Sequence, residues 1–295
     1  MDTIELKPKK RKAKFAFVDL IIICILVLTA FITIYPFIYT IAGSFSNGKD
    51  FQLGGIWLFP RVWTLDNYVL ILGDYRFWIS LGNTILRTVI GTVGSLLVTS
   101  LISYAMSHPK LPYKKFFRTF MIITMYFSGG IVPFFVLVKL IGLYDNFLVY
   151  ILPTLYSVYN MIVISNFFKN VDEGIREAAR IDGANEFQIW FKIYLPISFP
   201  VLVTVGMWVA VMNWNSYLPT LLYTNHDVSL WTLQYYILTI VKDASLPDGG
   251  AGLNDNITAQ TVSFAAMVLS MLPIALIYPI FRKKFSNSSD GASKE

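Results

Sequence analysis

Charged residues are scarce in this chain. Asp, Glu, Lys and Arg make up 14% of its 295 residues, whereas hydrophobic residues make up 55%. A water-soluble domain carries about a quarter charged residues, and a chain with so few cannot cover a globule with polar surface. The composition therefore favours an integral membrane protein. The net charge of +6 does not indicate nucleic-acid binding, because the basic residues cluster beside the ends of apolar runs, where they report membrane topology.

Cysteine and histidine are nearly absent as well. The single cysteine, Cys24, lies in an apolar run, so no disulfide can form within the chain. The two histidines, His108 and His226, lie in different loops, which argues against a metal site. The only carboxylate inside an apolar run is Asp19, at the edge of the first. That scarcity disfavours a proton- or Na⁺-coupled carrier, and the lack of a His, Asp, Glu and Ser cluster disfavours a membrane-embedded enzyme.

Long apolar runs are what the chain has instead, and six of them are long enough to cross a bilayer at about 20 residues per span. They cover Val18–Ala42, Phe77–Met106, Phe116–Leu140, Phe147–Phe168, Ile197–Leu222 and Ala259–Phe281. Backbone polar groups inside a bilayer must be bonded internally, so each run is expected to be a helix. The predicted fold class is an all-α integral membrane protein with six transmembrane helices. The membrane domain covers residues 15–285, between a basic tail (1–14) and a second tail (286–295).

The distribution of positive charge predicts the orientation of these spans. Eighteen lysines and arginines fall on the side that holds both termini, and five fall on the other side. Cytoplasmic loops carry the excess of Lys and Arg, so both termini and the loop after the fourth span are predicted to be cytoplasmic. In the large outer segment before the sixth span, the run Leu230–Ile237 predicts an interfacial helix. It is either a plain surface element or a surface that an external partner touches.

The predicted cytoplasmic loop over residues 170–196 is polar and charged, unlike the runs around it. Its candidate contact residues are Glu177, Ala178, Ala179, Asp182, Gly183, Ile193, Leu195 and Pro196. The first three favour a helix, and the paired alanines leave a bare surface that another protein can approach closely. Asp172 or Asn170 could cap this helix. Gly183 permits a sharp bend, and Pro196 is expected to end a second short helix.

Read as E-A-A-x-x-x-G-x₉-I-x-L-P, this loop resembles the coupling loop of ABC-importer permeases, the inner-membrane components of binding-protein-dependent transporters. All seven motif positions match. Other segments resemble the oligosaccharide branch of the maltose-type permeases: Phe127–Pro133, Gly142–Asp145, Ile151–Pro153, Asn166–Lys169 and Trp214–Ser216. The resemblance covers about residues 15–285. It implies the type I importer permease fold in a multi-pass protein of the bacterial plasma (inner) membrane.

The resemblance also implies a function and a set of partners. The chain would be a permease subunit that forms half of the translocation pathway for an oligosaccharide or related carbohydrate. Its partners would be a second homologous permease in a heterodimer, two ABC ATPase subunits, an extracytoplasmic solute-binding protein and membrane lipid, without nucleic acid. It would be no enzyme and hold no cofactor, with ATP and Mg on the partner ATPase.

The segment Gly43–Asp50 is similar to a P-loop, the phosphate-binding loop of many ATPases. Asp50, however, stands where a Mg²⁺-binding hydroxyl is required, so this segment is not expected to bind a nucleotide.

Three residues near the outer end of the fifth run are candidates for the solute pathway. Asn213, Trp214 and Asn215 combine amides with an aromatic face, a mixture that suits sugars. The alternative is an aromatic belt at the membrane interface. Because unpaired amides are costly against hydrocarbon, we favour a place on the solute route for them.

The second run supplies further candidates. Hydroxyl and small residues recur there at helical spacing and include Thr88 and Thr92. They either allow close helix packing, for which small residues are favoured in lipid, or line the solute path. Arg87 is an intramembrane charge and by default a functional candidate, although its side chain could instead reach the headgroups.

Overall fold

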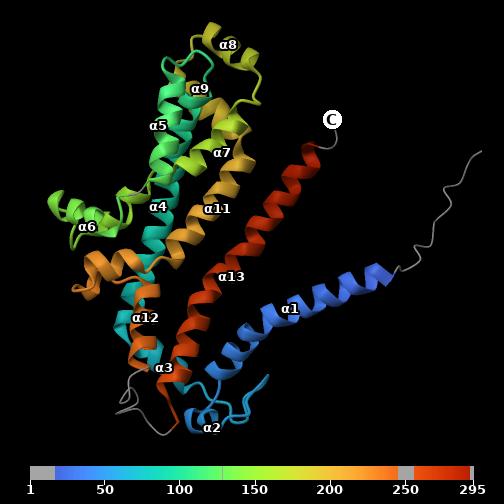
Figure 1. Ribbon diagram of the computed structural model, residues 1–295, viewed down its shortest axis with the longest axis vertical. Coiled ribbons are helices and arrows are strands. Elements are labelled where there is room, and N and C mark those ends of the chain that lie inside the picture. The colour runs from blue at the N-terminus through green and yellow to red at the C-terminus, as the bar shows by residue number, and fades with distance from the viewer. Residues whose placement is uncertain (1–16, 128, 245–255, 293–295) are drawn as a thin grey trace, which may run out of the picture.

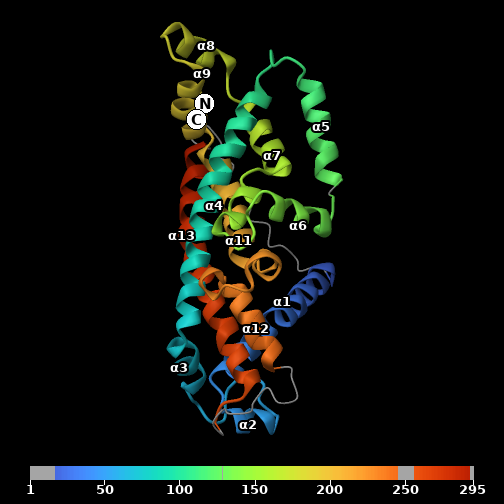
Figure 2. The same cartoon turned by 90° about the vertical axis from the view of Figure 1, so that its left-hand side faces the viewer.

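The computed structural model describes residues 17–127, 129–244 and 256–292. Within them the chain is helical, and the only extended pairing is one isolated bridge between Ser46 and Trp63. Three unbroken helices are long and apolar enough to cross a membrane: α1 (Phe17–Ser44), α4 (Tyr75–Ser107) and α13 (Ala259–Ala292). The molecule is elongated along α4 and α13 (Figures 1 and 2).

The other three predicted spans are bent pairs of helices. α5 (Lys114–Tyr126) and α6 (Ile131–Leu140) meet at 110°. The 3₁₀ turns η1 (Phe147–Tyr150) and η2 (Leu152–Thr154) meet α7 (Val158–Phe168) at 45°. The segment 186–197 meets α11 (Phe199–Asn215) at 85°. In the described part of the chain, three helices are therefore long and apolar enough to span a membrane, or up to six spans result if each bent pair counts as one.

Two predicted boundaries are wrong. The fifth run was expected to be helical to Leu222, but α11 ends at Asn215 and a short π-helical turn, η4 (Thr220–Thr224), follows Pro219. Pro219 cannot donate a backbone hydrogen bond, so it interrupts the helix there. The last helix continues past Phe281 to Ala292, because no proline or glycine lies between Pro279 and Gly291.

Small residues let α4 pack closely against its neighbours. A Cβ atom added to Gly91 of α4 would lie 3.0 Å from Asn213 Nδ2 of α11. A Cβ atom added to Gly206 of α11 would lie 3.0 Å from Leu96 of α4. Other small residues along α4 are buried in the same way: Thr84, Ser95, Thr99 and Ser103. For these four residues, the predicted role in close helix packing is confirmed.

A second group of helices packs around α13. α12 (Leu233–Ala244) and α3 (Asp66–Gly73) both contact it. The predicted interfacial helix at 230–237 begins at Leu233, and Leu233 and Tyr236 are buried in a cluster with α13 residues. It is therefore a packed element of the bundle. α1 leans away from the other helices, and most of its apolar side chains are exposed (Figure 1).

Candidate functional site

The segment predicted to couple to an ATPase projects from one end of the molecule (Figures 1 and 2). Its first helix, α8, covers Glu173–Ile181. Asp172 Oδ1 accepts a hydrogen bond from the backbone N–H of Gly174 over 2.9 Å, which confirms one of the two predicted caps. This bond satisfies one of the backbone donors that a helix N-terminus leaves open.

The end of α8 is a sharp turn at Gly183. Gly183 has φ +85°, a left-handed conformation that glycine adopts without strain. Its N–H donates to Arg180 O over 3.0 Å, and the N–H of Ala184 donates to Ala179 O over 2.9 Å. These two bonds make a Schellman motif, which caps the last carbonyls of the helix. The predicted bend is confirmed, and its geometry depends on Gly183.

The outward face of α8 combines acidic and apolar groups. Glu177, Ala178 and Asp182 are exposed, and Ile181 is 86% exposed. Ala179 points toward the bundle and is partly buried. The outward face of α8 is therefore a small surface of one apolar, one small and two acidic side chains on a projecting helix.

The chain returns to the bundle through α9 (Glu186–Ile189), the π-helical turn η3 (Trp190–Tyr194) and α10 (Leu195–Ile197). Ile193 and Leu195 pack against a buried cluster that includes Trp190 and Val205. Pro196 is exposed and lies in α10, and the helical stretch 186–197 ends one residue after it, so the expectation that Pro196 ends the second short helix holds to within one residue. The bend into α11 follows at Ser198.

This segment contains an ion pair that the sequence did not predict. Arg176 is 4% exposed, and its Nη2 donates to Glu186 Oε2 over 3.1 Å. Arg180 Nε donates to Glu186 Oε1 over 2.7 Å. The spacing of the two arginines places them on one face of α8, which was a detectable signal, but nothing in the sequence pairs them with Glu186. Nearby, burial lowers the pKa of His108, and Arg176 adds to the lowering.

Arg87 lies inside the protein and does not reach toward the headgroups, so the snorkelling alternative is wrong. It is 1% exposed, and its Nη1 donates to Ser216 O over 2.8 Å. Its guanidinium carbon lies 4.9 Å from the ring centre of Tyr150. Among the described residues no ion pair involves Arg87, and its Nε has no hydrogen-bond partner. A buried cation without a carboxylate is costly, so it needs an explanation beyond packing.

Other polar atoms near Arg87 are also without partners. The hydroxyls of Thr88 and Thr92 and the Nδ2 of Asn213 are buried and make no hydrogen bond in the described part of the chain. Asn213 lies against Gly91, so α4 and α11 bring these groups to one interface. Buried polar atoms without partners mark places where water, a ligand or another chain completes the bonding.

The three candidates at the end of α11 do not share a surface. Asn213 is 3% exposed, and Trp214 is 5% exposed with its Nε1 donating to Ser270 O over 3.1 Å. Asn215 is exposed, and its Nδ2 donates to Val211 O of its own helix over 3.0 Å. Trp214 therefore joins α11 to α13, whereas Asn213 faces α4. A role in a solute path stays a prediction for each of them.

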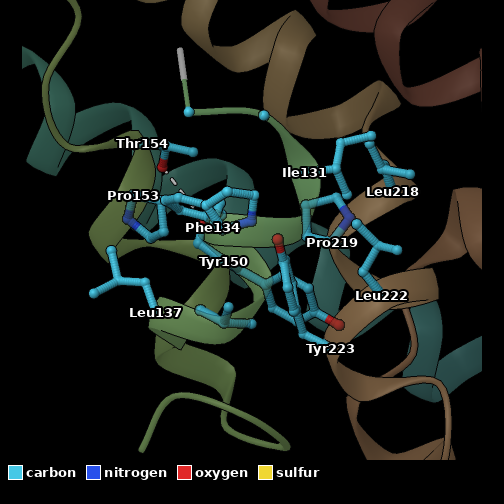
Figure 3. Close-up of a pocket in the computed structure, with 14 residues that line it drawn as sticks. Ile131, Phe134, Leu137, Tyr150, Pro153, Thr154, Leu218, Pro219, Leu222 and Tyr223 are labelled. Atoms are coloured by element: carbon cyan, nitrogen blue, oxygen red, sulfur yellow. Dashed lines mark hydrogen bonds between the residues drawn. The ribbon is translucent and has the colours of Figure 1, made fainter. Parts of the chain in front are cut away.

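A hollow of about 590 Å³ lies between α6, η1 and the segment after α11 (Figure 3). Its walls are mainly apolar and aromatic, with Phe134, Tyr150 and Tyr223 among them. The hydroxyl of Tyr150 is engaged in hydrogen bonds within the protein, because it donates to Leu230 O over 2.8 Å and also bonds to the Thr220 hydroxyl. The hollow can therefore offer ring faces but few free hydrogen-bonding groups.

Comparisons with known proteins place the chain in a family. The sequence model of the binding-protein-dependent transport system inner membrane component matches residues 97–288. The polygalacturonan/rhamnogalacturonan transport system permease protein YtcP of Bacillus subtilis is 35% identical, over 92% of this chain and 96% of that protein. Protein LplC of the same organism is 35% identical, over 86% of this chain and 87% of that protein.

The fold agrees with a solved structure. A chain from the crystal structure of a bacterial ABC transporter involved in the import of the acidic polysaccharide alginate has 31% identity and a TM-score of 0.84. The match covers 95% of this chain and all of that one. The chain therefore belongs to the family of binding-protein-dependent transport system inner membrane components and is a carbohydrate ABC transporter permease.

Proposed function

We propose that this chain is one of two different permease subunits in an ATP-driven carbohydrate importer, and that α8 docks on an ABC ATPase. The observation that carries the proposal is the form of α8. It projects from the bundle, ends in a Schellman turn at Gly183 and exposes Glu177, Ala178, Ile181 and Asp182. A rigid knob of this kind is suited to a cleft in a partner protein.

The orientation of the chain in the membrane and the subunit that hydrolyses ATP follow from this role of α8. The end that carries α8 faces the cytoplasm together with both termini, as the split of positive charge predicts. ATP and Mg²⁺ are bound and hydrolysed on the ATPase subunits. The chain itself supplies half of the pathway, and a solute-binding protein delivers the carbohydrate to the opposite end.

The proposed solute is an acidic oligosaccharide. YtcP is described as a permease for polygalacturonan and rhamnogalacturonan, and the alginate importer as one for an acidic polysaccharide. The support within this chain is Arg87, a buried cation without a carboxylate partner among the described residues. Its charge would favour an anionic solute in a pathway along α4 and α11, with Thr88, Thr92 and Asn213 offering hydrogen bonds.

Purification of the tagged chain from its native membrane tests the proposal. Mild-detergent extracts should yield an ABC ATPase and a second, different permease together with the chain. A Glu177→Lys and Asp182→Lys double variant should lose the ATPase and keep the second permease, because both changes lie on the exposed face of α8. A chain that purifies alone yet transports solute would support a self-sufficient carrier and contradict the proposal.

A further inference from the structure

Glu186 joins three helices through one carboxylate. Arg176 and Arg180 reach it from α8, as described above, and Glu186 itself is the first residue of α9. The third contact comes from α4, where Tyr104 Oη donates to Glu186 Oε2 over 2.5 Å. Both carboxylate oxygens are therefore bonded to α8, and one of them is also bonded to α4. Hydrogen bonds to a charged group are about twice as strong as those between neutral groups.

Arg176 depends on this carboxylate. Its side chain is 5% exposed, its Nε already lacks a partner, and its only ion pair among the described residues is with Glu186. The guanidinium also lies near the Tyr104 ring, with its carbon 5.8 Å from the ring centre. Removing the charge of Glu186 would leave a buried cation without compensation, so Arg176 would have to move outward and take α8 with it.

Tyr104 is fixed firmly within the bundle. Its ring packs edge-on against Tyr194 with 4.8 Å between ring centres, and Tyr194 packs in turn against Phe168 of α7. The same buried cluster includes Val205 of α11. This packing leaves the Tyr104 ring little freedom. A displacement of its hydroxyl therefore moves the packed residues around it in the cytoplasmic half of the bundle.

The turn between α8 and α9 could otherwise act as a hinge. It contains Gly183, whose added Cβ atom would meet nothing within 4 Å, so neighbouring side chains do not brace the turn from that side. The contacts from Arg176 and Arg180 to Glu186 bridge this turn, and Tyr104 ties the bridge to α4. Without them, α8 could rock about Gly183 while the bundle stayed still.

We propose that Tyr104, Arg176 and Glu186 form an interlock that makes α8 and the adjoining end of α4 move as one body. Glu186 is then a positioning residue for coupling, and the inference rests on the proposed function of α8. The same α4 helix carries Arg87, Thr88 and Thr92, so a displacement of α8 by an ATPase would reach the proposed solute path along one continuous helix.

Two mild variants test the interlock in the complete transporter. Tyr104→Phe removes one hydroxyl and keeps the packed ring, and Glu186→Gln removes the charge and keeps the shape. Tyr113→Phe and Glu173→Gln are matched controls, because Tyr113 is 81% exposed and Glu173 is exposed on α8 itself. Both test variants should keep the ATPase bound and basal ATP hydrolysis intact. Uptake of oligogalacturonate per ATP hydrolysed should fall about tenfold, the factor expected for one charge-assisted hydrogen bond.

A distance measurement separates positioning from a merely structural role. In a Cys24→Ser background, which removes the single cysteine, spin labels at Ile175→Cys and Ile90→Cys report the separation of α8 and α4. Both isoleucines are exposed, at 43% and 46%, and neither belongs to the proposed docking face. The distribution of label distances should be narrow in the parent and keep its width when the nucleotide changes. In Tyr104→Phe and Glu186→Gln it should broaden.

The outcomes separate the interlock from the proposed function. Parental uptake per ATP and a parental distance distribution in both test variants would overturn the interlock while leaving the proposed function standing. A parent chain that never binds an ATPase would overturn both. Broadened distances with tenfold weaker coupling in the two test variants, and in neither control, would establish the interlock.

Discussion

Substitution of Gly183 by valine isolates the backbone requirement of the α8 turn. Gly183 has φ +85°, a conformation that a β-branched residue adopts only under strain. A Cβ atom at this position would meet no heavy atom within 4 Å outside the adjoining residues. The main effect of the substitution is therefore expected from the local backbone conformation.

Such strain costs about 1–3 kcal/mol for a non-glycine residue. The turn can relieve it by losing the two Schellman bonds, from Gly183 to Arg180 O and from Ala184 to Ala179 O, which frees the end of α8. An ATPase that needs the native turn would then bind about 5- to 150-fold more weakly, since each 1.4 kcal/mol is a factor of ten. Membrane insertion should be unchanged, because the hydrophobicity of the spans is unaffected.

ATPase binding by the purified permease pair and solute-stimulated ATP hydrolysis measure this effect. Gly54→Val is the matched control, because Gly54 has φ +75°, its added Cβ meets nothing within 4 Å, and it follows α2 (Gly48–Gln52), which lies at the opposite end of the molecule from α8 (Figure 1). The control should bind the ATPase as the parent does. Normal ATPase affinity and normal stimulated hydrolysis in Gly183→Val would refute the reasoning that the turn presents α8 to its partner.

Two further predictions concern the proposed pathway. Arg87→Met should leave the thermal stability of the purified permease equal or higher, because the lost bond to Ser216 O is worth about 1.5–3 kcal/mol, whereas the relieved burial of an unpaired charge is worth several kcal/mol. Uptake of an acidic oligosaccharide should fall in this variant, and lower stability with normal uptake would show a structural role instead. Asn215→Leu should lower uptake while assembly and basal ATP hydrolysis stay intact, since within the described residues its side chain bonds only to Val211 O on its own helix. Normal uptake by this variant would favour a place at the lipid interface.

The form of the proposed coupling segment was predictable because it depends on local sequence. The Asp172 cap, the helix over Glu177–Ala179 and the bend at Gly183 each depend on the conformational preference of one or a few residues. Hydropathy likewise found all the apolar runs. It measures composition over a window, however, and does not detect where a helix is interrupted within a run. Hydropathy therefore does not place the bend near Gly130 or the early end of α11 before Pro219, whereas the break near Ser198 agrees with the predicted start of the fifth run at Ile197.

Contacts between segments far apart in the sequence could not be predicted from the sequence alone. Nothing local marks Tyr104 as the partner of Glu186, 82 residues away, or Trp214 as the partner of Ser270 on α13. Trp214 looked like a pathway or interface residue because tryptophan next to asparagine suits both, and only the packing shows that its ring is buried between helices. Arg87 was recognised as unusual from its type and place, whereas its lack of a carboxylate required the structure.

The most direct test of the account is ATP-dependent uptake by a reconstituted transporter of defined composition. Proteoliposomes would contain this chain, the second permease and the ATPase, with the binding protein loaded with oligogalacturonate outside. The account predicts uptake that requires ATP and stops when this chain, the second permease or the ATPase is omitted. Uptake that persists without the ATPase, or with this chain as the sole permease, would contradict it.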